Sequence, residues 1–279
     1  MADVISIDNK CSAVKYLAER DKRLKKVFEI IGPFTYKPYE DGYSFLVYQI
    51  IGQMLANKIA KVMRERLVSL CNGDISPSNI DALSDEQIKS IGISQKKVLY
   101  IRALTDRIRA DSSFLNSLQD LNDEQVMMKL VDIPGTGKWT AKMYLIFVLN
   151  RQDVLPVEDY AFIEAFEWVY KKKFTVKEIE AKCKKWKPYS SIVARYMYKI
   201  VDGGLLKTEF HLFKWGCMKI LNLTIECKAY YKTTIEVDDS MDIEDACRLA
   251  ESHFDDLQYE ELEYVPGYDT IDKNNSFFS

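Results

Sequence analysis

The sequence predicts an all-α domain of about ten helices followed by a small acidic α+β segment. Apolar residues recur at helical spacing through most of residues 1–207, and no convincing run of strands precedes Leu206. β-type composition begins only after that point. We therefore divide the chain into residues 1–207 and residues 208–279.

The first helices are expected between Lys10 and Leu70. Residues 12–31 carry apolar positions at helical spacing, and Gly32-Pro33 ends that helix. Residues 43–70 form a long amphipathic pattern that predicts two helices with a joint near Ala56-Asn57, where Asn57 can cap the second helix.

Capping signals place the helices that follow. Residues 84–87 (SDEQ) and 122–125 (NDEQ) have the form of a capping box, and Ser94 can cap a longer helix between them. Pro134 ends the helix that Asn122 begins. Further helices are expected over residues 138–149, from about residue 158, over 176–186 and over 190–202.

Residues 208–279 have a composition that favours strands as well as a helix. Residues 224–230 and 233–237 predict a hairpin, Asp242 can cap a helix over 243–254, and residues 258–265 predict a returning strand. This is a β-β-α-β arrangement.

Composition is that of a soluble globular protein, with 47% apolar and 29% charged residues among 279. No apolar run approaches the ~20 residues that span a bilayer, and no secretory signal is visible. The six cysteines form no close CxxC pair, which suits reduced thiols in a cytoplasmic protein and argues against a zinc site or cysteine-ligated iron–sulfur cluster.

Charge is distributed unevenly behind a net charge of −3. Residues 208–279 hold 6 Lys and Arg against 16 Asp and Glu, which leaves 33 against 26 for residues 1–207. The larger part could therefore attract a polyanion. On charge alone, a solvated basic face beside an acidic tail is the preferred interpretation.

A Gly-rich turn offers the first chemical signal. Two helices joined by Pro134-Gly-Thr-Gly137 leave backbone N–H groups without partners at the start of the second helix, and Lys138 and Lys142 add positive charge. Such a turn predicts an anion site, but a tight helix–helix turn without function explains it equally well. Asp159, which follows a proline break and begins a helix, is more readily an N-cap on these grounds.

The residues also resemble a known family. The pattern L-x-x-I-P-G-T-G-K-W-T-A from Leu130, followed by D-V-L-P-V-E-D, resembles the helix–hairpin–helix (HhH-GPD) DNA glycosylases, in particular the 3-methyladenine DNA glycosylase II (AlkA-type) branch. Residues 50–55 (IIGQML), 91–97 (IGISQKK) and 186–189 (WKPY) fit the same branch in the same order, so the resemblance covers roughly residues 12–205.

The resemblance implies a monofunctional DNA glycosylase of base excision repair that acts on alkylated purines. Asp159 matches the catalytic acid, and Glu158 fills the preceding acidic position. A carboxylate there stabilises the positive charge that develops on the sugar and can orient the attacking water.

The base pocket is implied by three aromatic residues. Trp139 stands where glycosylase–lyases carry a lysine, which favours water as the nucleophile and provides a stacking face for a flipped base. Tyr160 and Tyr198 are implied to face the same pocket. For Trp139 the alternative is a buried core residue; Trp168, Trp186 and Trp215 are assigned to packing.

DNA contacts are implied along two segments. Met54, with Gln53 beside it, matches the wedge that fills the hole left by a flipped base, although Met54 lies four residues after Ile50 and fits a core face equally well. The implied hairpin contacts are Pro134, Gly135, Thr136, Gly137, Lys138, Thr140 and Lys142. The family also holds a monovalent cation, Na⁺ or K⁺, through backbone carbonyls that match Val131, Ile133 and Thr136; no other cofactor is implied.

Three departures from the family leave questions open. Ser190 stands where relatives commonly have Arg, Ala56 where they often have a capping Ser, and the residues before Gly42 are too few for the N-terminal sheet domain of larger relatives, so any pocket wall from that domain must come from elsewhere. The tail faintly resembles DpnD/PcfM-like domains and is interpreted either as a protein-partner module or as an acidic flap that competes with DNA.

The expected partner is double-stranded DNA with damaged bases, bound by a monomer that does not enter membranes. The expected location is the cytoplasm, at the nucleoid in a bacterium or in the nucleus of a eukaryote. Alternatives are a helix–hairpin–helix protein that binds DNA without cutting, and a glycosylase for hypoxanthine, uracil or oxidised bases. A glycosylase–lyase is disfavoured by Trp139.

Overall fold

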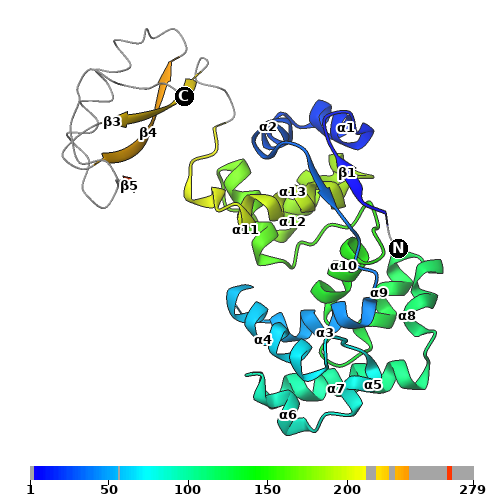
Figure 1. Cartoon of the computed structure of the whole chain (residues 1–279). Coiled ribbons are helices and arrows are strands. Elements are labelled where there is room, and N and C mark those ends of the chain that lie inside the picture. The colour runs from blue at the N-terminus through cyan, green and yellow to red at the C-terminus, as the bar shows by residue number, and fades with distance from the viewer. Residues whose placement is uncertain (1–2, 56, 212–217, 226–229, 239–262, 266–279) are drawn as a thin grey trace. The chain divides into compact units, whose positions relative to one another are not determined.

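A computed structural model of the chain describes residues 3–55, 57–211, 218–225, 230–238 and 263–265 (Figure 1). The chain divides into two compact units, Met1–Phe210 and His211–Ser279. In its described part, the first unit contains thirteen α-helices, three short 3-10 helices and one two-stranded sheet. None of the described helices is long and apolar enough to cross a membrane.

The helices are α1 (Ser12–Arg20), α2 (Lys22–Ile31), α3 (Gly42–Gly52), α4 (Asn57–Leu70), α5 (Pro77–Asp81), α6 (Asp85–Ser90), α7 (Gln95–Ala110), α8 (Phe114–Ser117), α9 (Asp123–Val131), α10 (Lys138–Phe147), α11 (Tyr160–Tyr170), α12 (Val176–Cys183) and α13 (Ser190–Asp202), with 3-10 turns at η1 (Leu118–Asp120), η2 (Lys184–Trp186) and η3 (Leu205–Lys207). The capping boxes at Ser84 and Asn122 are confirmed, as is the joint between α3 and α4. The short helices α5 and α8 were not predicted, which raises the count above ten.

Two short strands correct the expectation that no strand precedes Leu206. Strand β1 (Ile5–Ile7) pairs antiparallel with β2 (Phe34–Tyr36), and Ile5 lies opposite Tyr36. Each strand has three residues, too few for an alternating pattern to show in the sequence. The two strands flank α1 and α2 in the sequence, and their pairing brings the two ends of residues 5–36 together.

The single helix predicted over residues 12–31 is also wrong, because Asp21 divides it. Asp21 Oδ1 accepts hydrogen bonds from the backbone N–H groups of Arg23 and Leu24 and so caps α2. Its Oδ2 accepts from the Tyr170 hydroxyl and pairs with Lys185 at 2.8 Å. Burial raises the pKa of Asp21, but the hydrogen bonds from Lys185 and Tyr170 outweigh it and hold the pKa below its usual range.

The helices of the first unit form two groups (Figure 1). Helices α1, α2, α11, α12 and α13 gather on one side, where α13 packs against α2 and α11. Helices α3 to α8 form the other group, where α3 packs against α4 and α7. Helix α10 contacts α3 and α9 and lies between the groups. The large buried side chains, among them Tyr144, Phe166 and Trp186, come from both groups and from α10.

In the second unit the described residues form a three-stranded antiparallel sheet in the order β3-β4-β5. Strands β3 (Met218–Ile225) and β4 (Tyr230–Asp238) are neighbours, and β5 (Glu263–Val265) pairs with β4. The first strand begins earlier than residue 224, where the sequence predicted it. The helix expected over residues 243–254 lies outside the described residues.

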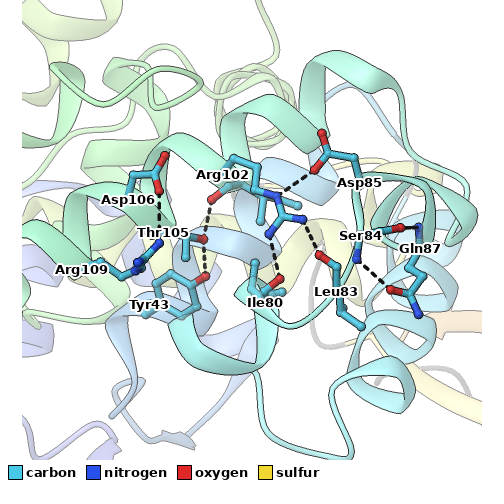
Figure 2. Close-up of polar contacts among 11 residues, drawn as sticks. Tyr43, Ile80, Leu83, Ser84, Asp85, Gln87, Arg102, Thr105, Asp106 and Arg109 are labelled. Carbon is cyan, nitrogen blue, oxygen red and sulfur yellow. Dashed lines mark hydrogen bonds and ion pairs between the residues drawn. The ribbon is translucent and has the colours of Figure 1, made fainter.

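Arg102 of α7 joins this helix to the small helices α5 and α6 (Figure 2). Its Nε donates to Asp85 at 2.8 Å, and its Nη1 and Nη2 donate to the carbonyls of Ile80 and Leu83 at 2.8 and 2.5 Å. These carbonyls end α5 and the loop after it, so the guanidinium satisfies acceptors that a short helix leaves open.

We expect the substitution Arg102→Met to lower the free energy of unfolding by about 2–3 kcal/mol, because two carbonyls and a carboxylate lose their donor. Arg109→Met on the same helix is the matched control. Arg109 is exposed and forms surface ion pairs with Asp81 and Asp106, so its loss should stay below about 0.5 kcal/mol. Urea denaturation measures both, and equal effects would contradict the role given to Arg102.

Candidate active site

The predicted hairpin forms between α9 and α10. Gly135 has φ +86°, and a Cβ there would lie 2.3 Å from Cγ of Tyr100 on α7, so only glycine fits. Gly137 is the N-cap of α10 and supplies no side-chain cap, and a Cβ added to it would meet nothing within 4 Å. The first N–H groups of α10 therefore lack a side-chain cap and lie at the positive end of the helix dipole, as an anion site requires.

The hairpin residues proposed to contact DNA differ in how far they are exposed to solvent. Pro134, Gly137 and Lys138 are exposed, and Lys138 forms no ion pair among the described residues. Gly135 is half-buried, and the side chains of Thr136 and Thr140 are buried.

Lys142 is already engaged within the protein. Its ammonium donates to Glu158 at 2.7 Å and to the Leu155 carbonyl at 2.9 Å. Its charge is thus balanced internally, and Lys138 is the better phosphate ligand of the two.

Asp159 is the N-cap of α11 and is also the centre of a buried cluster. Oδ1 accepts from the N–H groups of Ala161 and Phe162 at 2.8 and 3.2 Å. Oδ2 accepts from Trp139 Nε1 at 2.5 Å and from the Tyr198 hydroxyl at 3.2 Å. The side chain is 8% exposed. The capping role expected from the local sequence is therefore confirmed, and the same carboxylate also accepts hydrogen bonds from two aromatic side chains.

Tyr198 reinforces this arrangement. Burial, the charge of Asp159 and the hydrogen bond to it raise the pKa of Tyr198 well above 10. The hydroxyl therefore stays protonated through the neutral range and can donate to Asp159. Its ring lies 5.8 Å from that of Phe147.

These residues line a cleft of about 1010 Å³. It brings together, from the predicted set, Gln53, Met54, Gly137, Trp139, Thr140, Asp159, Tyr160 and Tyr198. Tyr160 is 75% exposed and so stands at the rim. Phe34 and Tyr36 of β2 also line the cleft, so this short strand supplies one of its walls.

Sequence reasoning missed a second cleft cluster, which centres on Arg195. The buried guanidinium lies 3.6 Å above the ring of Tyr36 and 4.9 Å from that of Phe147, and Nη2 donates to the Ile146 carbonyl at 2.5 Å. Burial lowers the pKa of Arg195 to about 10. The available signal was spacing, since Arg195 precedes Tyr198 by three positions and so shares its face of the helix.

Met54 is fully exposed, with φ +59°, so the interpretation as a core residue is wrong. Gln53 beside it donates from Nε2 to the Gly135 carbonyl at 2.7 Å. The loop that carries the exposed Met54 is therefore hydrogen-bonded to the hairpin turn through Gln53.

In the part of the chain that the structure describes, the hairpin turn holds one buried, unpaired oxygen beside the carbonyls that the resemblance implies for a monovalent cation. The Ile133 carbonyl accepts from the Thr136 N–H at 3.0 Å, and Oγ1 of Thr136 is buried without a hydrogen-bond partner in the described structure. Carbonyl and hydroxyl oxygens are the donors that hard cations take. No group of His, Cys, Asp and Glu that could hold a metal occurs among the described residues.

The remaining sequence assignments concern packing. Trp186 is fully buried, and Trp168 donates to the Thr208 carbonyl at 2.6 Å; Trp215 lies outside the described residues. Ser190, which replaces the family's arginine, is buried and its hydroxyl donates to Asp153 at 2.5 Å. A local polar contact thus occupies that position.

A helix–hairpin–helix turn beside an aromatic cleft with a buried carboxylate is the arrangement that the sequence resemblance implied. The family model described as HhH-GPD superfamily base excision DNA repair protein matches residues 47–188. The chain belongs to this superfamily.

Individual relatives point to one branch. The chain is 25% identical over 198 residues to DNA-3-methyladenine glycosylase 1 of Schizosaccharomyces pombe, covering 66% of this chain and 84% of that protein. It is 29% identical over 178 residues to DNA-3-methyladenine glycosylase of Saccharomyces cerevisiae, covering 60% of each. A crystal structure of DNA-3-methyladenine glycosidase from Bacillus halodurans superposes with a TM-score of 0.66 at 27% identity, covering 75% of this chain and 97% of that one. The predicted resemblance to the 3-methyladenine DNA glycosylase branch is confirmed.

We expect Gly135→Ala to lower the free energy of unfolding by about 2–4 kcal/mol, because alanine adds both positive-φ strain and a clash with Tyr100. Gly137→Ala, two positions away, should leave stability nearly unchanged because its Cβ has free space. Thermal and urea unfolding of the two variants test this, and equal stability of both variants would contradict the tight fit at Gly135.

Proposed function

We propose that this protein is a monofunctional 3-methyladenine-type DNA glycosylase that flips an alkylated purine out of duplex DNA and hydrolyses its N-glycosidic bond, leaving an abasic site. The observation that carries this proposal is the geometry of Asp159, whose carboxylate is fixed by four donors inside a cleft lined by Trp139 and Tyr198. Membership of a base excision repair superfamily supports the same conclusion.

The proposed reaction follows from the position of the carboxylate. As the bond between C1′ of the sugar and the base nitrogen breaks, its electron pair leaves with the base and positive charge develops on the sugar. Asp159 stabilises that charge and takes a proton from the water that adds to C1′. Fixing the carboxylate in advance removes the need to reorganise it during the reaction.

Trp139 supports water as the nucleophile. Its indole nitrogen already donates to Asp159, which fixes the ring in the cleft wall, and the side chain has no amine that could attack the sugar. The ring offers a π face to an electron-poor base. Tyr198 would complete the inner wall, and the exposed Tyr160 would contact the nucleotide from the rim.

DNA would be held at two points of one surface. The open N–H groups of α10 and the exposed Lys138 would bind backbone phosphates, and a Na⁺ or K⁺ ion in the turn would add positive charge at the same place. Met54 would enter the duplex where the base has left, with Gln53 beside it.

Asp159→Asn is expected to lower the rate of base excision by about 10²–10⁴-fold, because the amide cannot take the proton from water. Duplexes with 3-methyladenine, 7-methylguanine, hypoxanthine, uracil or 8-oxoguanine serve as substrates, and strand breaks are scored before and after alkali. Excision by the parent should leave alkali-sensitive sites only. No excision of any lesion would favour a DNA-binding protein without activity, and breaks without alkali would indicate a lyase.

Asp21→Asn is the matched control for that experiment. Asp21 is also a buried N-cap that accepts hydrogen bonds from a tryptophan, Trp186, and a tyrosine, Tyr170, but it does not line the cleft. Its substitution should cost stability and leave excision per folded molecule unchanged. A loss of activity as large as that of Asp159→Asn would show that both variants act through folding.

For residues 208–279, we propose two roles that an experiment can separate: a module for a protein partner, or an acidic flap that competes with DNA for the first unit. The excess of 16 acidic over 6 basic residues supports the flap. Replacing Asp255, Asp256, Glu260 and Glu261 by their amides should then raise DNA affinity at low salt and have little effect at high salt. Unchanged affinity across the salt series would reject the flap.

A further inference from the structure

Lys97 of α7 holds the end of α3, next to Met54, which is one of the two points where DNA would be held; the other is the hairpin between α9 and α10. Its Nζ donates to the carbonyl of Ile51 at 2.7 Å and to that of Gln53 at 2.8 Å. These bonds cross 46 and 44 positions of sequence. Among the described residues, Lys97 has no carboxylate partner, so the backbone at the end of α3 is its principal partner.

An ammonium group stabilises the end of α3. Gly52 is the last helical residue and Gln53 the C-cap, so the carbonyls around them lack intrahelical donors. A cation there satisfies those acceptors and complements the negative end of the helix dipole. Burial lowers the pKa of Lys97, which shows that the group is partly removed from water to reach this position.

The loop that Lys97 holds carries a strained and exposed residue. Met54 has φ +59°, in the left-handed region that residues with a Cβ rarely adopt, and its side chain is fully exposed. Such a conformation persists only where the surroundings over-determine it. Here the determinants are the two bonds from Lys97 and the short turn in which the Leu55 N–H donates to the Gly52 carbonyl at 3.2 Å.

The same face of α7 also fixes the hairpin. Tyr100, three residues after Lys97 and so on its face of the helix, packs against Gly135 so closely that no Cβ fits between them. Gln53 closes the loop by donating to the Gly135 carbonyl at 2.7 Å. One turn of α7 therefore sets the separation between the exposed Met54 and the amides at the start of α10.

We propose that Lys97 is a positioning residue for duplex opening, which holds Met54 in its projecting conformation at a fixed distance from the phosphate-binding hairpin. This inference rests on the proposed function. Lys97 would contact neither the base nor the sugar. Its effect would appear only where a base must be taken out of a stack, because a single strand leaves no hole to fill.

The test compares Lys97→Met with Lys96→Met. Both substitutions remove one positive charge from the same end of α7, but Lys96 is exposed, and its ammonium lies 5.7 Å from the centre of the Tyr100 ring. Lys97→Met should lower excision from duplex DNA about tenfold and leave excision from the same single-stranded sequence within about twofold of the parent. Lys96→Met should leave excision from both duplex and single-stranded DNA close to that of the parent. Lys97→Gln, which keeps a donor, should give an intermediate loss and serves if the methionine variant is poorly folded.

Two further measurements separate positioning from a general effect on folding. In a Met54→Ala background, Lys97→Met should have little additional effect on duplex excision, because the side chain it positions is gone. The fluorescence of 2-aminopurine placed opposite an abasic site should rise on binding of the parent and rise less with Lys97→Met. This signal does not depend on catalysis, so it decides the inference even if no lesion is excised and the proposed function fails.

Equal losses on duplex and single strands, additive effects of the Met54 and Lys97 substitutions, or an unchanged 2-aminopurine signal would each overturn the assignment.

Discussion

The carboxylate of Asp159 connects three helices of the first unit. One oxygen begins α11, and the other joins Trp139 of α10 to Tyr198 of α13. Three helices therefore meet at one negative charge, and each donor that stabilises the fold also removes a degree of freedom from the group. A substitution of Asp159 that changes the chemistry of the cleft therefore also removes the cap of α11 or its contacts with α10 and α13.

Asp21 shows that such a set of donors does not by itself make a reactive site. It too begins a helix and accepts hydrogen bonds from a tryptophan and a tyrosine, but Lys185 neutralises it at 2.8 Å and it does not line the cleft described above. Asp159 lacks a cationic partner in the described structure and borders a cleft large enough for a nucleotide base. The difference lies in access and in charge balance rather than in hydrogen-bonding partners.

Local signals in the sequence predicted those parts of the fold that depend on neighbouring residues. The capping boxes at Ser84 and Asn122, the glycine hairpin and the helix from Ser190 to Asp202 are examples, and the family motif added Asp159 and Trp139. Contacts between distant segments were out of reach. Strands β1 and β2 are too short to show a period, Asp21 breaks a pattern that is helical on both sides, and Lys97 looks like any solvated lysine until α3 is placed beside it.

The wall built by Phe34 and Tyr36 has a consequence for how such a protein can change. It stands on a ribbon of two three-residue strands, which has little stability of its own and no part in the cluster around Asp159. Mutations in this ribbon can reshape one side of the cleft while the helices that hold the carboxylate remain intact. Under the proposed function, the range of accepted bases is thereby open to adaptation separately from bond cleavage, because Phe34 and Tyr36 lie outside the segments that hold Asp159.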